Sequence, residues 1–287
     1  MLVVVAAVQL PAIGAGAILY PGRHRTIATA PQSCESTAFS GEGVTLRGWR
    51  CAARLERRGT LVYLHGIADN RSGSVGIVDR FTARGFDVIA YDSRAHGESG
   101  GDACTYGYFE KLDLRRVIDT AAPGPIVLIG TSLGAAVALQ EAAVDDRVTA
   151  VVAAEAFSDL RTVAIERAPF VFRFGFVEPS FRRAEAAGHF QIDAVSPLRA
   201  AASIKAPTLL VHGAADTETP PDHSRRIFGA LSGAKRLSIV PGAGHNESLR
   251  GSAWSEIDSW IEASMTAGMP SSKVSSNACR ARTPMAS

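Results

Sequence analysis

A serine flanked by two glycines is the first group in this sequence that could do covalent chemistry. The pattern G-x-S-x-G covers residues 130–134, after an apolar run and before an alanine-rich stretch. Glycines on both sides of a serine let a strand turn sharply into a helix, which leaves the hydroxyl exposed at the turn. The N-terminus of that helix also favours developing negative charge. We therefore expect Ser132 to be a nucleophile.

A serine hydroxyl is a poor nucleophile until a base removes its proton, and the chain has a histidine and an acid in suitable places. Asp216 and His245 each follow a short apolar run. Chains with this kind of serine turn carry the nucleophile, the acid and the histidine in that order. We expect His245 to take the proton from Ser132 and Asp216 to hold the imidazole. Asp159, just past another apolar run, is the alternative acid.

Negative charge that forms on a carbonyl oxygen under attack needs backbone N–H donors. Leu133, directly after the serine, supplies one of them. The loop that begins at His65 and Gly66 supplies the other, which indicates Ile67. We expect His65 to order this loop rather than to carry protons, because the sequence arranges no third group around it.

These groups require a scaffold that brings the ends of strands together. Six short apolar runs rich in β-branched residues occur at 60–64, 86–91, 125–130, 148–154, 208–211 and 237–240. Segments with helical spacing occur at 74–84, 109–120, 133–143, 223–231 and 253–265. Strands that are apolar on both faces and alternate with helices are typical of a parallel sheet with helices on both sides. The sequence predicts an α/β, doubly wound fold, preceded by a β-hairpin over residues 34–53.

Residues 157–200 interrupt this alternation of strands and helices. The segment has no clear strand and carries apolar clusters that include Phe170, Phe172 and Phe174. Ligands of such folds bind at the C-terminal edge of the sheet. We expect a helical lid there whose phenylalanines line an apolar acyl pocket, with plain packing against the sheet edge as the alternative. Residues 268–287 are polar and without periodicity, and we expect a disordered tail.

The first 20 residues carry no charge and are mostly apolar, and a basic cluster follows at 23–25. A run of this length can span a bilayer, and the basic cluster favours a cytoplasmic C-terminal side. A secretory signal is not well formed, because no basic residues precede the apolar run. We expect residues 1–30 to be a membrane anchor, with the protein membrane-associated and otherwise cytoplasmic. The alternatives are a mispredicted start and a segment that packs on the core.

The composition argues against other classes of function. The chain has 287 residues, with 30 Lys and Arg against 28 Asp and Glu, and no basic stripe, so no nucleic-acid partner is expected. Its four cysteines form no C-x-x-C pair and no zinc-ligand spacing, so we expect no metal site. In an exported chain the cysteines permit but do not require a disulfide among Cys34, Cys51 and Cys104, because the compartment decides whether cysteines are bridged.

These motifs resemble those of the α/β-hydrolase superfamily over residues 36–262. The segment 92–99 resembles that family's D-x-R-G-H-G-x-S loop, with Ala95 where glycine is usual. With its apolar N-terminus, the chain is similar to uncharacterised membrane-anchored bacterial members near the prolyl-oligopeptidase-like and monoglyceride-lipase-like branches. The resemblance implies an α/β-hydrolase domain over 31–267, with a mostly parallel sheet, an antiparallel N-terminal hairpin and a short helical lid. It implies triad roles for Ser132, Asp216 and His245, oxyanion roles for Ile67 and Leu133, and no cofactor or metal.

The expected reaction is acyl transfer to water. Ser132 would attack the carbonyl carbon of a small-molecule carboxylic ester or thioester, and water would then release the acyl group. The same residues also suit a prolyl-oligopeptidase-like peptidase, an acyltransferase or a cofactor-free haloperoxidase. A catalytically inactive binding module is the alternative from a different class, although such a module does not need a nucleophile, an acid and a base in this order.

Overall fold

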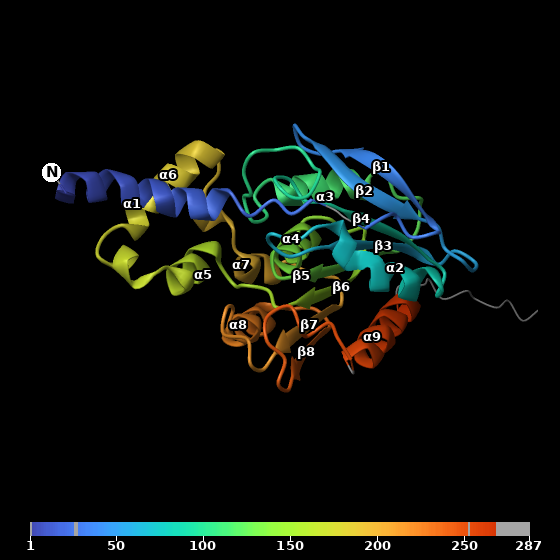
Figure 1. The fold of residues 1–287 in the computed structure, drawn as a ribbon. Coiled ribbons are helices and arrows are strands. Elements are labelled where there is room, and N and C mark those ends of the chain that lie inside the picture. Colours follow the sequence, from blue (N-terminus) through green and yellow to red (C-terminus); the bar gives the residue numbers. More distant parts are fainter. Residues whose placement is uncertain (1, 26–27, 252, 268–287) are drawn as a thin grey trace, which may run out of the picture.

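The computed structural model describes residues 2–25, 28–251 and 253–267, and an eight-stranded sheet forms the centre of this part of the chain (Figure 1). The strands are β1 (Cys34–Ser40), β2 (Thr45–Cys51), β3 (Gly59–Leu64), β4 (Phe86–Tyr91), β5 (Ile126–Thr131), β6 (Val148–Ala154), β7 (Thr208–Gly213) and β8 (Lys235–Val240). Their order is β1-β2-β4-β3-β5-β6-β7-β8. Strands β3 to β8 run parallel, whereas β2 is antiparallel to β1 and β4. The predicted mostly parallel sheet with an antiparallel N-terminal hairpin is confirmed.

The apolar runs of the sequence form strands because both of their faces are covered. Every residue of β3, β5 and β7 is buried. By contrast, β8 begins with the exposed residues Lys235 and Arg236 and lies at the edge of the sheet. Charged residues on an edge strand discourage pairing with another chain. Continuous apolar character, rather than alternation, therefore marks the central parallel strands.

Helices cover both faces of the sheet, which confirms the doubly wound arrangement (Figure 1). One face carries α2 (Val75–Thr82), which follows the 3-10 turn η1 (Arg71–Ser74), and α9 (Ala253–Ala267). The other face carries α3 (Glu110–Ile118), α4 (Leu133–Ala142) and α8 (Asp222–Ala230). Phe81 and Ile257 are fully buried on the first face, as are Leu114 and Ile227 on the second. Helix α4 is buried on all sides, whereas the other helices bury one face against the sheet.

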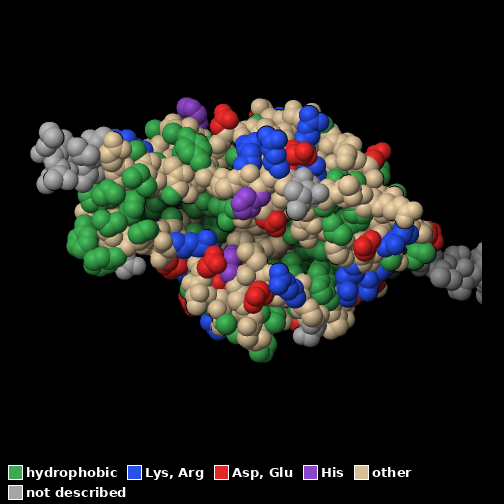
Figure 2. Space-filling view, viewed as in Figure 1, with side chains coloured by type: hydrophobic (Ala, Val, Ile, Leu, Met, Phe, Trp, Pro, Cys, Tyr) green, Lys and Arg blue, Asp and Glu red, His purple; other side chains and the backbone are tan. Residues whose placement is uncertain are grey.

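Between β6 and β7 the chain forms helices, in the region where the sequence predicts a lid. They are α5 (Leu160–Arg167), the 3-10 turns η2 (Phe170–Arg173) and η3 (Ile192–Ala194), α6 (Val177–Gly188) and α7 (Pro197–Ala201). Helices α5 and α6 lie together with α1 (Leu2–Leu19) at one end of the molecule (Figure 1). Leu19, Phe157 and Phe181 are buried in the apolar cluster that joins these elements. Figure 2 shows hydrophobic side chains gathered over this end.

The apolar N-terminal segment packs on the folded body. Leu19 is buried, and its carbonyl accepts the N–H of Cys104 at 2.8 Å. The Tyr106 hydroxyl donates to the Ile18 carbonyl at 3.0 Å. Within the part of the chain that the structure describes, no helix is both long and apolar enough to cross a membrane. The membrane anchor expected from the sequence stays a prediction.

Cys34 and Cys51 face each other across the β1–β2 pair and form a disulfide. A bridge that closes a loop of this size stabilises a fold by about 3 kcal/mol. Cys104 is a free, buried thiol. The sequence leaves the pairing among these three cysteines open, because only the register of the hairpin brings two of them together. The tail expected to be disordered, residues 268–287, lies outside the described residues.

Candidate active site

Ser132 lies at a sharp turn between β5 and α4. Its φ of 50° and ψ of −111° are strained for a residue with a side chain. The two glycines of the motif allow the close approach that this turn needs. A Cβ at Gly134 would lie 2.2 Å from the carbonyl oxygen of Leu64, and one at Gly130 would lie 2.4 Å from the backbone of Gly134. The turn therefore has the geometry of a nucleophile elbow.

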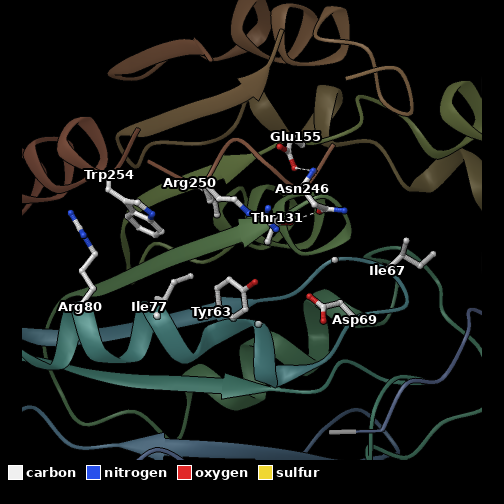
Figure 3. Close-up of a pocket in the computed structure, with 14 residues that line it drawn as sticks. Tyr63, Ile67, Asp69, Ile77, Arg80, Thr131, Glu155, Asn246, Arg250 and Trp254 are labelled. Atoms are coloured by element: carbon white, nitrogen blue, oxygen red, sulfur yellow. Dashed lines mark hydrogen bonds between the residues drawn. The ribbon is translucent and has the colours of Figure 1, made fainter. Parts of the chain in front are cut away.

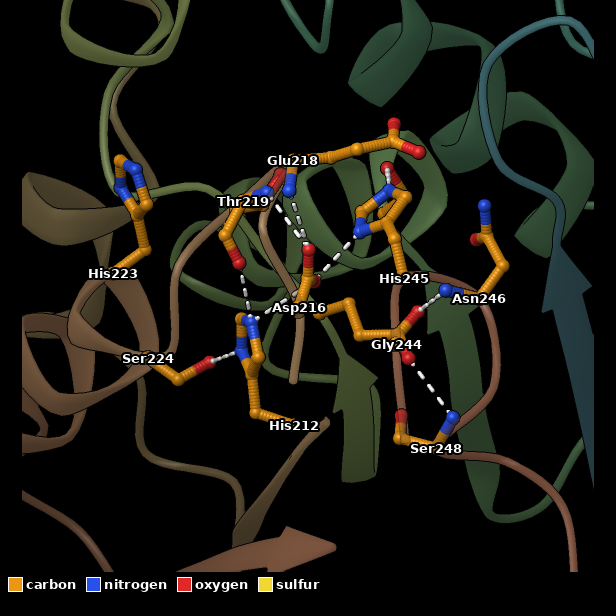
Figure 4. Close-up of polar contacts among 12 residues, drawn as sticks. His212, Asp216, Glu218, Thr219, His223, Ser224, Gly244, His245, Asn246 and Ser248 are labelled. Atoms are coloured by element: carbon orange, nitrogen blue, oxygen red, sulfur yellow. Dashed lines mark hydrogen bonds and ion pairs between the residues drawn. The ribbon is translucent and has the colours of Figure 1, made fainter. Parts of the chain in front are cut away.

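The three side chains expected to form a triad lie in one hydrogen-bonded line, and Figure 4 shows the contact between His245 and Asp216. The distance from Ser132 Oγ to His245 Nε2 is 3.0 Å, and that from His245 Nδ1 to Asp216 Oδ2 is 2.7 Å. The other carboxylate oxygen of Asp216 accepts the backbone N–H groups of Glu218 at 3.0 Å and Thr219 at 2.9 Å. Because a carboxylate accepts, Nδ1 carries the imidazole proton and Nε2 is free to accept the serine proton.

The alternative acid, Asp159, lies away from this line. It precedes α5, and its carboxylate accepts the hydroxyl of Ser196 at 2.5 Å. The carboxylate that contacts His245 belongs to Asp216.

A second histidine, His212, also contacts the carboxylate of Asp216 (Figure 4). Its Nε2 lies 3.2 Å from Asp216 Oδ2 and 2.7 Å from the carbonyl oxygen of Thr219, while its Nδ1 lies 2.6 Å from Ser224 Oγ. Since a carbonyl only accepts, Nε2 donates. Burial alone would raise the pKa of Asp216, but the hydrogen bonds from His212 and His245 outweigh it and hold this pKa well below its usual range. Asp216 is therefore ionised at neutral pH.

Glu155, which the sequence analysis missed, holds the loop that carries His245. It directly follows β6, is buried, and has a φ of 56°. Its carboxylate accepts the N–H groups of Asn246 at 2.6 Å, Glu247 at 3.1 Å and Ser248 at 2.9 Å. An acid at the end of a buried strand was the available signal, since a carboxylate there needs partners.

The loop after β3 lies beside Ser132. A Cβ at Gly66 would lie 3.6 Å from Ser132 Cβ. The buried ring of His65 donates from Nδ1 to the Gly66 carbonyl at 2.7 Å and accepts the N–H of Ser93 at 2.9 Å. Burial lowers the pKa of His65. The ring is therefore neutral and orders the loop, while Ile67 follows Gly66 and Leu133 follows the serine.

Ala95 adopts the backbone conformation of the glycine that is usual in the 92–99 loop. Its φ is 60°, in the left-handed region, which costs roughly 1 kcal/mol for a residue with a Cβ. The carboxylate of Asp92 accepts the N–H groups of Arg71 at 2.7 Å and Glu98 at 2.8 Å. These contacts hold the loop and explain why it keeps its shape without the glycine.

Two cavities border the loop after β3, and Ile67 of this loop lines both. The first, of about 420 Å³, is lined by polar side chains that include Asp69, Thr131 and Arg250 (Figure 3). The second, of about 350 Å³, lies among α1, α5 and α6 and is mainly apolar. Among the described residues, no group of three His, Cys, Asp or Glu side chains is placed to hold a metal ion.

Comparison with known proteins shows the family. Residues 61–256 match the model of the alpha/beta hydrolase family, so the chain belongs to that family. The uncharacterized protein YqkD of Bacillus subtilis is 29% identical over 231 residues, which is 75% of this chain and 74% of that protein. A monoacylglycerol lipase of Mycolicibacterium smegmatis is 27% identical over 247 residues, which is 71% of this chain and 88% of that protein.

Solved structures share the fold. The esterase Pf2001 of Pyrococcus furiosus superposes with a TM-score of 0.69 at 23% identity and covers 85% of this chain and 99% of its own. The acylaminoacyl peptidase of Pyrococcus horikoshii superposes with a TM-score of 0.61 at 18% identity over 79% of this chain and 40% of its own. The chain shares its fold with these proteins, in agreement with the family match.

Proposed function

We propose that this hydrolase cleaves carboxylic esters or thioesters, with Ser132 as nucleophile, His245 as general base and Asp216 as the acid that orients it. One observation carries the proposal: the unbroken line of hydrogen bonds from the serine hydroxyl through the imidazole to an ionised carboxylate. A structural serine does not need a strained turn, a histidine and a carboxylate in this arrangement.

In the proposed reaction Ser132 Oγ attacks the carbonyl carbon while its proton passes to His245 Nε2. The N–H groups of Ile67 and Leu133 stabilise the oxyanion. The C–O bond of the ester (C–S in a thioester) then breaks, and the leaving group takes the proton from His245. A water molecule attacks the acyl-enzyme in the same way, and the proton returns to Ser132 as the carboxylic acid leaves.

An apolar acyl group is the substrate feature that the second cavity supports. Phe172 lines this cavity, as the sequence analysis expects. Phe170 and Phe174 do not line it; their side chains are 71% and 68% exposed and contact each other. The expectation that all three phenylalanines form the pocket is therefore revised to Phe172 alone.

The test compares turnover of p-nitrophenyl esters by the wild type and by Ser132→Ala. We expect the substitution to lower kcat by about 10⁴-fold or more, because the acyl-enzyme cannot form. Unchanged turnover would show that Ser132 is not the nucleophile. If the wild type cleaves no ester, its reaction with a fluorophosphonate is the next measurement. Labelling at Ser132 would show an activated serine, and amides or other acyl acceptors would then be tested as substrates.

Ser158 offers a matched control, because it is a second serine beside a histidine. Its Oγ lies 2.9 Å from His223 Nδ1, and His223 Nε2 lies 2.7 Å from Glu166. Its backbone N–H also points at Nδ1, at 3.1 Å, and its side chain is fully buried. We expect Ser158→Ala to keep turnover within about threefold of the wild type, since these contacts join α5 to α8 and involve none of Ser132, Asp216 and His245.

A further inference from the structure

The N-terminal helix supplies one wall of the apolar cavity. Four of its residues line the cavity: Ile13, Gly14, Ala17 and Ile18. The segment between β6 and β7, here called the insertion, lines the opposite side with residues that include Val163 of α5 and Phe172 of η2. Ile67, whose N–H is the proposed oxyanion donor, completes the wall. The cavity therefore extends from the loop beside Ser132 to a helix that lies more than a hundred residues away from this serine in the sequence.

The polar side chains around this cavity all have partners. The Tyr106 hydroxyl donates to the Ile18 carbonyl at 3.0 Å, and the Ser180 hydroxyl donates to the Phe176 carbonyl at 2.7 Å. Arg167 donates to the Glu218 carbonyl at 2.9 Å and to the Thr219 hydroxyl at 2.6 Å. An apolar ligand thus leaves no polar group unpaired, which avoids the main cost of filling such a space. A volume of about 350 Å³ lies at the lower end of the range for small-molecule sites.

Close packing holds helix α1 in this position. A Cβ at Gly14 would lie 2.3 Å from Ser180 Oγ and 2.7 Å from Phe172 Cε1, so the helix backbone directly contacts the insertion there. At its C-terminal end, Leu19 is buried and its carbonyl accepts the N–H of Cys104. Because the contacts at Gly14 and Leu19 fix α1, the distance between α1 and the insertion is defined. This distance limits the size of the ligand that the cavity can hold.

We propose that α1 is a wall of the acyl-binding site and sets the length of the acyl chain that the enzyme accepts. The inference rests on the proposed function: the carbonyl of the ester is held at Ser132 and Ile67, and its acyl chain extends between α1 and the insertion. The apolar character that makes residues 2–19 resemble a membrane anchor then serves substrate binding.

The experiment fills the cavity from α1 with Ala17→Trp. The matched control is Ala12→Trp, because Ala12 is the same residue type on the same helix but lines a separate groove beside α6. For Ala17→Trp we expect kcat/KM for p-nitrophenyl octanoate to fall by about tenfold or more and that for the acetate to change less than about twofold. For Ala12→Trp both values should stay near those of the wild type. Equal losses for the two esters, or no loss for octanoate, would overturn the inference.

Two further measurements keep the inference separate from protein folding and from the proposed function. Ala164→Trp fills the same cavity from α5 and carries the same expectation if the α1 variant unfolds. If the wild type cleaves neither ester, the proposed function fails, and binding of dodecanoate by calorimetry still tests the cavity. The wild type and Ala12→Trp should bind dodecanoate at least about tenfold more tightly than Ala17→Trp. Equal affinities, or no binding by the wild type, would overturn the inference in that case.

Discussion

Two residues at the ends of neighbouring strands have a backbone conformation that non-glycine residues rarely adopt. Ser132 has a φ of 50° after β5, and Glu155 has a φ of 56° after β6. Each conformation costs on the order of 1–3 kcal/mol and persists only where surrounding contacts hold it. The N–H of Ser132 donates to Ala154, and that of Glu155 donates to Val211, both at 2.8 Å. A hydrogen bond to the neighbouring strand thus holds each residue. The strained conformations therefore persist only when the strands of the sheet are paired.

Replacement of Glu155 tests whether its carboxylate positions His245. In Glu155→Gln the amide cannot offer two charged acceptors to three N–H groups, so we expect a loss of about 2 kcal/mol in the free energy of unfolding. Because the loop that carries His245 then shifts, kcat should fall by about tenfold with little change in KM. Urea unfolding and steady-state kinetics measure the two effects.

The control for this substitution is Glu218→Gln. The side chain of Glu218 is 65% exposed, and its nearest ion-pair partner, Arg167, lies 3.8 Å away. An exposed substitution of this kind changes stability by about 0.5 kcal/mol or less. If both variants have the stability and kcat of the wild type, the carboxylate of Glu155 does not hold the loop.

At the scale of elements, the contact between α4 and β3 decides where Ser132 lies. Gly134, in the first turn of α4, touches the backbone of Leu64 at the end of β3. Backbone atoms cannot move aside as the end of a flexible side chain can. A methyl group at this position must therefore push the helix away from the sheet, and the turn at Ser132 moves with it.

We expect Gly134→Ala to lower the free energy of unfolding by about 2–3 kcal/mol, as overpacked core positions do. Gly229→Ala in α8 is the control, because a Cβ there meets no atom within 4 Å. Alanine is the better helix former. The free energy of unfolding of this variant should therefore equal that of the wild type or exceed it by up to about 1 kcal/mol. Urea unfolding of both variants tests the pair; equal stabilities would contradict the proposed close contact.

The stability of the whole molecule depends on histidines that stay neutral inside it. Burial lowers the pKa of His96 to about 4. An unfolded chain binds this proton near pH 6.5. The contribution of His96 is therefore fully present above pH 6.5 and is lost as the pH falls toward 4, by roughly 3 kcal/mol. Glu141, whose pKa burial raises to about 7, acts in the opposite sense over part of this range.

A comparison of wild type with His96→Asn isolates this effect. Asparagine keeps an N–H donor for the Arg94 carbonyl, which the ring contacts through Nδ1 at 2.8 Å. From pH 7 to pH 4 the wild type should lose roughly 3 kcal/mol more of its free energy of unfolding than His96→Asn loses. The reason is that only the wild type carries the histidine that must be protonated. Urea unfolding at several pH values measures it; a constant difference would show that His96 titrates alike in both states.

The sequence alone determined the sheet and the candidate nucleophile. Continuous apolar runs separated by helical spacing predict a parallel sheet, because strands covered on both faces need no alternation. The carboxyl ends of parallel strands meet at one edge, so Ser132, Asp216 and His245, each placed after such a run, could be expected to lie together. Local pattern and chain order carry this information, and the confirmed fold agrees with both.

Only the tertiary structure decided which groups surround these three residues. The contacts of Glu155 and His212 join loops that are distant in the sequence, and no local pattern records such distances. The same holds for the disulfide between Cys34 and Cys51, which depends on strand register. The position of α1 was open for a different reason: the apolar residues that suit a bilayer also suit the apolar surface of a protein. Hydropathy shows only that a segment avoids water. Whether a bilayer or the protein surface covers the segment depends on tertiary packing.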